Sequence, residues 1–257
     1  MERLILIETS TALCSAALAE DGVITAYRES SAPKAHASLT AVFIQEMLEE
    51  KGLTIADCDA VCVSKGPGSY TGLRVGVSTA KGLCFGSGKP LIAIGTLDIL
   101  TAQAQEASPE TGIADPSETV IADTSETVIA DLIGNPPHIV PMIDARRMEV
   151  YAATFKRSEA TPRYTQVTET APAIIDETSY TDLLNEGPVL FIGDGAGKCA
   201  DVIKHPSAHF CQCHPKASSM LAPSAVALNE KRFEDVAYFE PFYLKEFVAT
   251  VSKKKLF

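Results

Sequence analysis

The start of the chain carries apolar runs of the length of β-strands. RLILIETS, from Arg3 to Ser10, has the continuous apolar run of a buried strand. CSAALAEDGVITAYRES, from Cys14 to Ser30, predicts two further strands that meet at the Asp21-Gly22 turn. The chain therefore begins with a predicted meander of three strands.

The next part of the chain alternates between helical and strand patterns. A helix is predicted from His36 to Lys51, ended by Gly52, and a second helix follows Ser69, which is a suitable N-cap. The short apolar runs AVCVSK and LIAI stand on either side of the second helix and predict strands. This order indicates a mixed sheet with helices packed on it.

Neither a helical nor a strand pattern is evident between Glu106 and Pro137. IADPSETV at residues 113–120 is followed by IADTSETV at residues 121–128, and this eight-residue period is too short for a solenoid unit. The segment is acidic and has no aromatic residue, so we interpret it as an exposed insertion or linker between two lobes. Its deletion from Ile113 to Val128 should leave activity intact.

A second set of strands follows. IVPMIDARRMEVYAATFKR predicts a β-hairpin with its turn at Asp144 to Arg147, and a strand at APAII, a helix near Tyr180, a strand at VLFI and a helix after Ser218 come next. These patterns predict an α/β protein with a first lobe at residues 1–105, the insertion or linker at 106–137, and a second lobe at 138–257 whose last segment could return to the first lobe.

Composition and charge argue against several classes of protein. With 46% hydrophobic residues in 257, the chain can bury a sizeable core. Its apolar runs are far shorter than the ~20 residues of a membrane span, and no signal-peptide pattern is present, so we expect a cytoplasmic protein. A net charge of -11 disfavours a protein that alone grips a phosphate backbone. Seven cysteines without a framework fit a reducing compartment.

Two stretches could hold phosphate. GDGAGK, from Gly193 to Lys198, has three residues between its outer glycines and is followed by Cys199, whereas a Walker A loop needs four and then a Ser or Thr, so a strand-to-helix turn is favoured. The first strand ends in a hydroxyl-rich turn, of the kind that also serves caps and ST-turns. The candidate phosphate-binding residues are Thr9, Ser10, Thr11, Gly193, Asp194 and Gly195.

Histidines and cysteines gather near the end of the second lobe. The cluster consists of His205, His209, Cys211, Cys213 and His214. Nitrogen and sulfur ligands suit zinc, but the spacing H-x3-H-x-C-x-C-H lacks the paired CxxC of a closed tetrahedral site. The alternation in HFCQCH is also typical of a strand. We therefore predict no metal site.

The two long helices of the first lobe carry more apolar and small residues than one core face needs. The helix after His36 has one stripe with Ala37, Ala41, Ile44 and Leu48, and another with Leu39, Phe43 and Met47. A second stripe predicts either deep burial or a partner. The helix after Ser69 keeps interior glycines, which cost about 1 kcal/mol each relative to alanine. They form two ridges for close backbone approach, one with Gly72 and Gly76 and one with Ser78, Gly82 and Gly86.

Several motifs together resemble the bacterial TsaB (YeaZ) family. The most specific is GPGSYTGLRVG at residues 66–76, followed by AKGL at residues 80–83. The resemblance is extended over nearly the whole chain by ILIETS, by His36 at the start of the first long helix, and by DARRMEVY, GDGA and EPFYLKEF. The repeat at residues 113–128 is not part of the family pattern.

The resemblance implies a fold of two ribonuclease H-like lobes, as in the actin-like ATPase superfamily, and a role in making threonylcarbamoyladenosine at position 37 of tRNA. In this family the protein is the non-catalytic partner of the transferase TsaD, with which it forms a heterodimer. TsaE, an ATPase, joins them, and tRNA is reached through the complex. The resemblance further implies a homodimer when the protein is alone, no tightly bound cofactor, and ATP used by the wider complex.

The resemblance also implies which residues act. In the family, the first two long helices pack against their counterparts in TsaD as a helical bundle. The predicted partner-binding residues are Leu39, Phe43, Met47, Tyr70, Gly72, Leu73, Gly76, Val77 and Ala80. TsaD carries a metal-binding HxxxH just after the corresponding strand, where this chain has Thr96 and Leu100, and neither side chain can replace an imidazole. No catalytic or metal-binding residue is expected.

Two other functions remain open from the sequence. One is a nucleotide-hydrolysing enzyme of the actin-like ATPase type, with the turn at Thr9 to Thr11 and the turn at Gly193 to Ala196 as phosphate loops. The incomplete Walker pattern and the lack of an evident catalytic acid with a metal partner oppose it. The other is a protease, which the absence of HExxH and of a nucleophile-base pair opposes.

Overall fold

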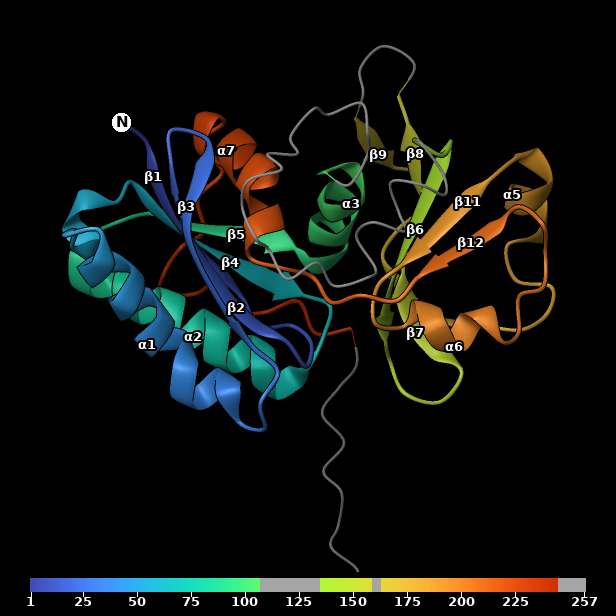
Figure 1. Ribbon diagram of the computed structural model, residues 1–257, viewed down its shortest axis with the longest axis horizontal. Coiled ribbons are helices and arrows are strands. Elements are labelled where there is room, and N and C mark those ends of the chain that lie inside the picture. The colour runs from blue at the N-terminus through green and yellow to red at the C-terminus, as the bar shows by residue number, and fades with distance from the viewer. Residues whose placement is uncertain (107–134, 159–162, 245–257) are drawn as a thin grey trace, which may run out of the picture.

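The computed structural model describes residues 1–106, 135–158 and 163–244, and it consists of two lobes that are each built on a mixed sheet (Figure 1). The first sheet contains β1 (Arg3–Glu8), β2 (Cys14–Glu20), β3 (Val23–Ser30), β4 (Ala60–Gly66) and β5 (Leu91–Gly95). Its order is β3-β2-β1-β4-β5. The first three strands pair antiparallel, and β4 and β5 continue the sheet in parallel with β1.

The second sheet repeats this topology. It contains β6 (His138–Asp144), β7 (Glu149–Ala152), β10 (Ala171–Ile174), β11 (Val189–Ile192) and β12 (Ala208–Cys211), with β8 (Phe155–Arg157) and β9 (Tyr164–Gln166) attached beside β6. Its order is β10-β7-β6-β11-β12, again with an antiparallel meander followed by two parallel neighbours. The same order of pairing in both sheets is that of two ribonuclease H-like lobes, as predicted.

Helices cover both faces of the first sheet (Figure 1). One face carries α1 (Ala35–Glu50) and α2 (Tyr70–Ser87), and the other carries α3 (Thr96–Glu106) and α7 (Leu221–Asn229). The side chains of Ile5 and Ile7 pack on the first pair of helices, while Leu4 and Leu6 pack on the opposite face. Burial on both faces explains why β1 is a continuous apolar run instead of an alternating one.

The remaining helices of the described ranges are short. They are α5 (Thr181–Glu186), α6 (Ala196–Ala200) and the 3-10 turns η1 (Ile55–Asp57) and η3 (Ser218–Met220). GDGAGK forms the predicted strand-to-helix turn between β11 and α6. Ser69 is the predicted N-cap of α2, and its side chain accepts a hydrogen bond from the Gly72 N–H at 3.3 Å.

The end of the described chain returns to the first lobe. Met220 and Ala227 belong to the apolar cluster beneath the first sheet, and the Glu234 N–H donates to the Leu91 carbonyl at 2.9 Å. Lys81 on α2 donates from Nζ to the carbonyls of Ala237 and Phe239 at 3.1 and 3.0 Å. The returning segment therefore lies against α2 and fixes one flank of that helix.

All seven cysteines are buried and free. No helix in the described ranges combines the length and the apolar character that crossing a bilayer requires. The predicted repeat at residues 113–128 lies outside the described residues.

Candidate functional site

The first ridge of small residues on α2 packs inside the chain. A Cβ added to Gly72 would lie 2.1 Å from the carbonyl oxygen of Thr9, and one added to Gly76 would lie 2.2 Å from Thr9 Oγ1. The Thr9 hydroxyl in turn donates to the Gly72 carbonyl at 2.9 Å. These glycines let α2 approach the end of β1, so their packing partner is the chain itself.

The structure contradicts the exposed surface that the sequence predicted. Of the predicted partner-binding residues, Phe43, Met47, Gly72, Leu73, Gly76, Val77 and Ala80 are buried, and Leu39 and Tyr70 are half-buried. Leu39 packs against the core of the first lobe, and the ring of Tyr70 lies 4.7 Å from that of Tyr243. Because α1 contacts β2, β3 and α2 together, the large residues of both stripes are turned inward, and only the small residues Ala37 and Ala41 are left outside.

The two helices expose a different surface, which we call the α1/α2 face. Figure 1 shows α1 and α2 side by side on the outside of the first lobe. On α1 the face contains Ala37, Ser38, Ala41, Val42, Gln45, Glu46 and Glu49, and on α2 it contains Thr71, Arg74, Ser78, Gly82, Phe85 and Gly86. The second ridge of small residues on α2 therefore points away from the chain.

No contact within the described chain explains why Gly82 and Gly86 are glycines. A Cβ added to Gly82 or Gly86 meets nothing within 4 Å. Each interior glycine costs a helix about 1 kcal/mol relative to alanine, and no close contact offsets this cost here. Phe85, between these two glycines, is 87% exposed, and Val42 on α1 is 40% exposed. Single exposed apolar residues are ordinary, but their combination with an uncompensated glycine ridge is typical of a surface for another helix.

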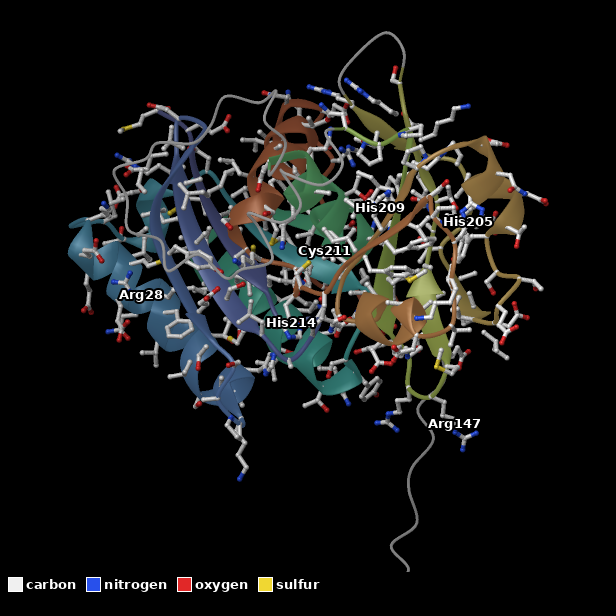
Figure 2. All side chains as sticks on the ribbon, turned by 45° about the vertical axis from the view of Figure 1, so that its right-hand side comes forward. Arg28, Arg147, His205, His209, Cys211 and His214 are labelled. Carbon is white, nitrogen blue, oxygen red and sulfur yellow. The ribbon has the colours of Figure 1, made fainter. Side chains whose placement is uncertain are left out.

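Ion pairs and hydrogen bonds hold several acidic side chains of α1 in place. Arg28 on β3, labelled in Figure 2, lies 3.6 Å from Glu46 and 2.6 Å from Glu50. The hydrogen bond from Arg28 lowers the pKa of Glu50. Gln45 donates to Glu49 at 2.7 Å along α1. The α1/α2 face therefore combines small and apolar residues with acidic side chains, of which Glu46 is paired with Arg28.

A cleft of about 940 Å³ lies between the two lobes. The first lobe contributes the turn after β1 and the start of α2, and the second lobe contributes the β6–β7 hairpin. Of the candidate phosphate-binding residues, Ser10, Thr11 and Asp194 line the cleft, whereas Thr9, Gly193 and Gly195 do not.

A buried carboxyl group supports the turn after β1, which forms the first-lobe wall of the cleft. Glu8 is fully buried, and its Oε1 accepts a hydrogen bond from the Ser10 N–H at 2.5 Å. Burial raises the pKa of Glu8 to about 7, opposed by hydrogen bonds from Ser10 and Ser64. The imidazole Nε2 of His36 lies 2.9 Å from the Thr11 carbonyl oxygen, so the first turn of α1 holds this loop in place.

The second-lobe wall is a hydrogen-bonded hairpin. Lys198 Nζ pairs with the Asp144 carboxylate and donates to the carbonyls of Arg147 and Glu149 at 2.8 and 2.7 Å. Asp194 accepts the Asp144 N–H at 2.9 Å, and burial raises the pKa of Asp194. The guanidinium of Arg147 projects from the hairpin tip in Figure 2.

The two positions at which the resemblance places the metal ligands of TsaD are buried, and neither carries an imidazole. Thr96 begins α3, and Leu100, one turn later, is fully buried among apolar residues between the lobes. A Cβ on Gly193 would lie 2.9 Å from Leu100 Cδ1 and 2.3 Å from the Met142 carbonyl oxygen. Gly193 therefore serves the close packing of β11, β6 and α3.

The histidine and cysteine cluster does not converge. The four labelled members, His205, His209, Cys211 and His214, are spread along the segment in Figure 2. His205 Nδ1 accepts the Ser207 N–H at 3.1 Å, and the His214 carbonyl accepts from Gln103 on α3 at 3.2 Å. Within residues 1–106, 135–158 and 163–244, no three His, Cys, Asp or Glu side chains form a group suited to a metal ion.

One sequence relative covers nearly the whole chain, and others match its first half. It is 28% identical to the tRNA threonylcarbamoyladenosine biosynthesis protein TsaB of Escherichia coli over 252 residues, which is 96% of both proteins. It is 41% identical to TsaB of Haemophilus influenzae over 104 residues, 40% of this chain and 42% of that protein. Residues 29–130 match the model of the family TsaD: tRNA N6-adenosine threonylcarbamoyltransferase. A 67-residue stretch is 42% identical to the transferase of Maricaulis maris, covering 26% of this chain and 18% of that enzyme.

A solved structure has the same fold. YeaZ from Pseudomonas aeruginosa superposes with a TM-score of 0.73 at 23% identity, over 95% of this chain and 100% of that one. The chain thus has the two-lobed fold of YeaZ, with ribonuclease H-like topology in both lobes and a cleft between them. The similarity over 96% of both chains points more narrowly to TsaB (YeaZ) proteins, to which this chain is similar in sequence as well as in fold.

Proposed function

We propose that this protein acts in tRNA threonylcarbamoyladenosine biosynthesis as a non-catalytic subunit that binds and activates TsaD through the α1/α2 face. The observation that carries the proposal is the outward ridge of Gly82 and Gly86, which nothing in the described chain covers, around the exposed ring of Phe85. A second helix pair can approach such a ridge closely enough for backbone contact.

The sequence comparisons support TsaD as the partner. The TsaD family model covers residues 29–130, and this range contains both helices of the α1/α2 face. A partner related in this region would offer a similar pair of helices. Related surfaces can meet about a pseudo-twofold axis, as identical ones do in a twofold dimer. The same geometry supports self-association of this chain when TsaD is absent.

The residues at the TsaD metal position support a non-catalytic role. Thr96 and Leu100 offer one hydroxyl and one isobutyl group where TsaD would have two imidazoles, and Leu100 fills the space with hydrocarbon. In this proposal TsaD performs the transfer, TsaE and ATP act in the wider complex, and tRNA is bound through the complex. The chain itself needs no tightly bound cofactor, and its location in the cytoplasm stays a prediction.

Sedimentation velocity of the chain mixed with TsaD from the same organism tests the interface. Phe85→Asp replaces the most exposed apolar side chain of the α1/α2 face by a charge, and Gly82→Leu fills the ridge without touching the chain's own core. Each change should weaken TsaD binding by at least about 30-fold, as loss of a central interface contact does. Homodimerisation should weaken as well.

Ile174→Asp is the matched control, because Ile174 is 79% exposed on the edge strand β10 of the other lobe. It should leave both associations unchanged. Unaltered TsaD binding by folded Phe85→Asp and Gly82→Leu proteins would refute the proposed interface.

A further inference from the structure

Two neighbouring arginines occupy strained backbone positions at the tip of the β6–β7 hairpin. Arg146 and Arg147 have φ values of 72° and 50°, in the left-handed region. Glycine, asparagine and aspartate adopt this region readily, whereas other residues do so at a cost in free energy. Because a turn alone would favour those residues, two arginines in these positions point to a function for their side chains.

Hydrogen bonds hold the tip in this conformation. The Arg146 N–H donates to Asp144 Oδ1 at 2.7 Å, and the Glu149 N–H donates to the Arg146 carbonyl at 3.2 Å. Lys198 Nζ donates to the Arg147 carbonyl at 2.8 Å and pairs with the Asp144 carboxylate. The charge of Asp144 is thereby offset by Lys198 and not by an arginine of the tip.

The guanidinium groups of the tip are exposed and not paired with a carboxylate. Within residues 1–106, 135–158 and 163–244, no Asp or Glu oxygen lies within 4.0 Å of Arg146 or Arg147 side-chain nitrogens. Figure 2 shows the labelled Arg147 side chain reaching away from the body of the second lobe. Arginine offers a rigid fork of N–H donors that matches phosphate oxygens. The tip therefore presents an exposed pair of anion-binding groups.

A third cation lies on the first-lobe side of the cleft rim. Lys34 directly precedes α1, and His36, two residues later, lines the cleft together with Arg146 and Arg147. Lys34 has a φ of 66°, and its side chain makes no capping hydrogen bond. A helix N-terminus favours acceptors and negative charge, so α1 itself does not account for a lysine at this position. Both lobes thus place cations in strained positions at one rim.

The proposed function supplies a polyanion for these cations. The net charge of -11 opposes strong binding of RNA by this chain alone. A few exposed cations can still bind phosphates once another protein holds the RNA in place. Phosphate contacts of this kind add affinity and fix the position of the RNA without reading its sequence.

We propose that the tip of the β6–β7 hairpin contacts the phosphate backbone of tRNA while TsaD holds the tRNA for modification. Arg146 and Arg147 each bind a phosphate, and Lys34 adds attraction from the first lobe. This inference rests on the proposed function, because the chain meets tRNA in its complex with TsaD. It gives the subunit a direct RNA contact on a surface separate from the α1/α2 face.

Fluorescence anisotropy of labelled tRNA, titrated with the complex of this chain and TsaD at several salt concentrations, tests the contact. Asparagine tolerates the left-handed backbone, so Arg146→Asn/Arg147→Asn removes both charges without adding strain. This double variant should weaken tRNA binding by at least about 10-fold at physiological salt. The slope of log affinity against log salt concentration should fall in magnitude by about 1.4–1.8, the share of two phosphate contacts.

Lys156→Gln/Lys204→Gln is the matched control, because it removes two exposed positive charges from the same lobe. Lys156 on β8 pairs with His138 at the start of β6, whereas the tip follows the end of β6. The control should leave the tRNA affinity and the salt slope unchanged. In thermal melts, Arg146→Asn/Arg147→Asn should be at least as stable as the unchanged protein, since the strain is relieved.

Unchanged tRNA affinity and salt slope of the tip variant would overturn the proposal, as would an equal loss in the control. Sedimentation velocity without tRNA separates this inference from the proposed function. The tip variant should bind TsaD like the unchanged chain, and a loss of TsaD binding would place the tip against protein instead of RNA. If the unchanged chain forms no complex with TsaD, the proposed function fails and this inference with it. A complex that binds tRNA independently of the tip refutes this inference alone.

Discussion

Gly72 and Gly82 stand ten residues apart on one helix, and an added methyl group would meet different surroundings at each. At Gly72 it would lie 2.1 Å from the Thr9 carbonyl oxygen, whereas at Gly82 it would meet nothing within 4 Å. Gly72→Ala should lower the free energy of unfolding by about 1–3 kcal/mol, as overpacking does. Gly82→Ala should raise it by about 0.5–1 kcal/mol, since it removes only the cost of glycine in a helix.

Urea denaturation of the two proteins checks this prediction. Equal changes of either sign would contradict the division of the glycines into an inward and an outward ridge. Gly82→Ala is also the mildest change on the α1/α2 face, so its stability gain should be separable from any loss of TsaD binding.

Glu8 makes the stability of the fold depend on pH. Burial raises its pKa from 4.5 to about 7, so the folded state holds a proton that the unfolded state has already lost between these values. Stability is therefore fully present below pH 4.5 and declines as pH rises to about 7, by about 3 kcal/mol in total from this group. Glu8→Gln should remove this decline.

Denaturant unfolding of the unchanged protein and of Glu8→Gln at several pH values measures the difference directly. The two curves of unfolding free energy against pH should diverge from pH 4.5 upward and run parallel above about pH 7. Parallel curves over the whole range would mean that Glu8 ionises normally in the folded protein.

The helices α1 and α2 each contain one phenylalanine, and the two rings lie in different environments. Phe43 is 8% exposed in the core of the first lobe, and Phe85 is 87% exposed. Phe43→Ala should cost about 3–5 kcal/mol of unfolding free energy, and Phe85→Ala should stay within about 0.5 kcal/mol of the unchanged protein. Thermal melts of both proteins check this, and a Phe85→Ala protein as unstable as Phe43→Ala would show that the helix face is assigned to the wrong side.

The helix face is also where sequence reasoning failed. The periodicity of α1 correctly revealed two apolar stripes, but it cannot say how many neighbours a helix has. Because β2, β3 and α2 all contact α1, both stripes of large residues are buried and the small residues Ala37 and Ala41 are left outside. On α2, both glycine ridges can be seen in the sequence. The position of Thr9 in the fold decides that Gly72 and Gly76 pack inside the chain and that the other ridge faces outward.

Other elements could be predicted because local chemistry decides them. The Asp21-Gly22 turn has φ values of 48° and 80°, the left-handed conformations that this dipeptide favours, and Ser69 caps α2 as its side chain allows. The helix α3 was not predicted; it follows β5 directly, and eight of its 11 residues are buried, so few polar positions mark a solvent-facing side. The cleft was not predicted as a whole, because the turn after β1 and the β6–β7 hairpin are more than a hundred residues apart in sequence.

For the whole molecule, the two lobes share a topology but differ in what they expose. The first lobe presents two long helices with an outward glycine ridge, while the helices of the second lobe, α5 and α6, have six and five residues. The returning segment near Phe239 is bound to α2 through Lys81 and leaves the α1/α2 face open. This asymmetry places the proposed partner surface on the first lobe.

The central claim is that the α1/α2 face makes this chain a binding subunit of the tRNA-modifying complex. The most direct test is the yield of threonylcarbamoyladenosine in tRNA, measured by mass spectrometry, in a reaction reconstituted from TsaD, TsaE, the activated threonylcarbamoyl donor, ATP and this chain. Modification should require this chain, Ile174→Asp should replace it fully, and Phe85→Asp should need at least about 30-fold more protein to reach the same yield. Full yield without the chain, or equal titration curves for folded Phe85→Asp and unchanged protein, would contradict the claim.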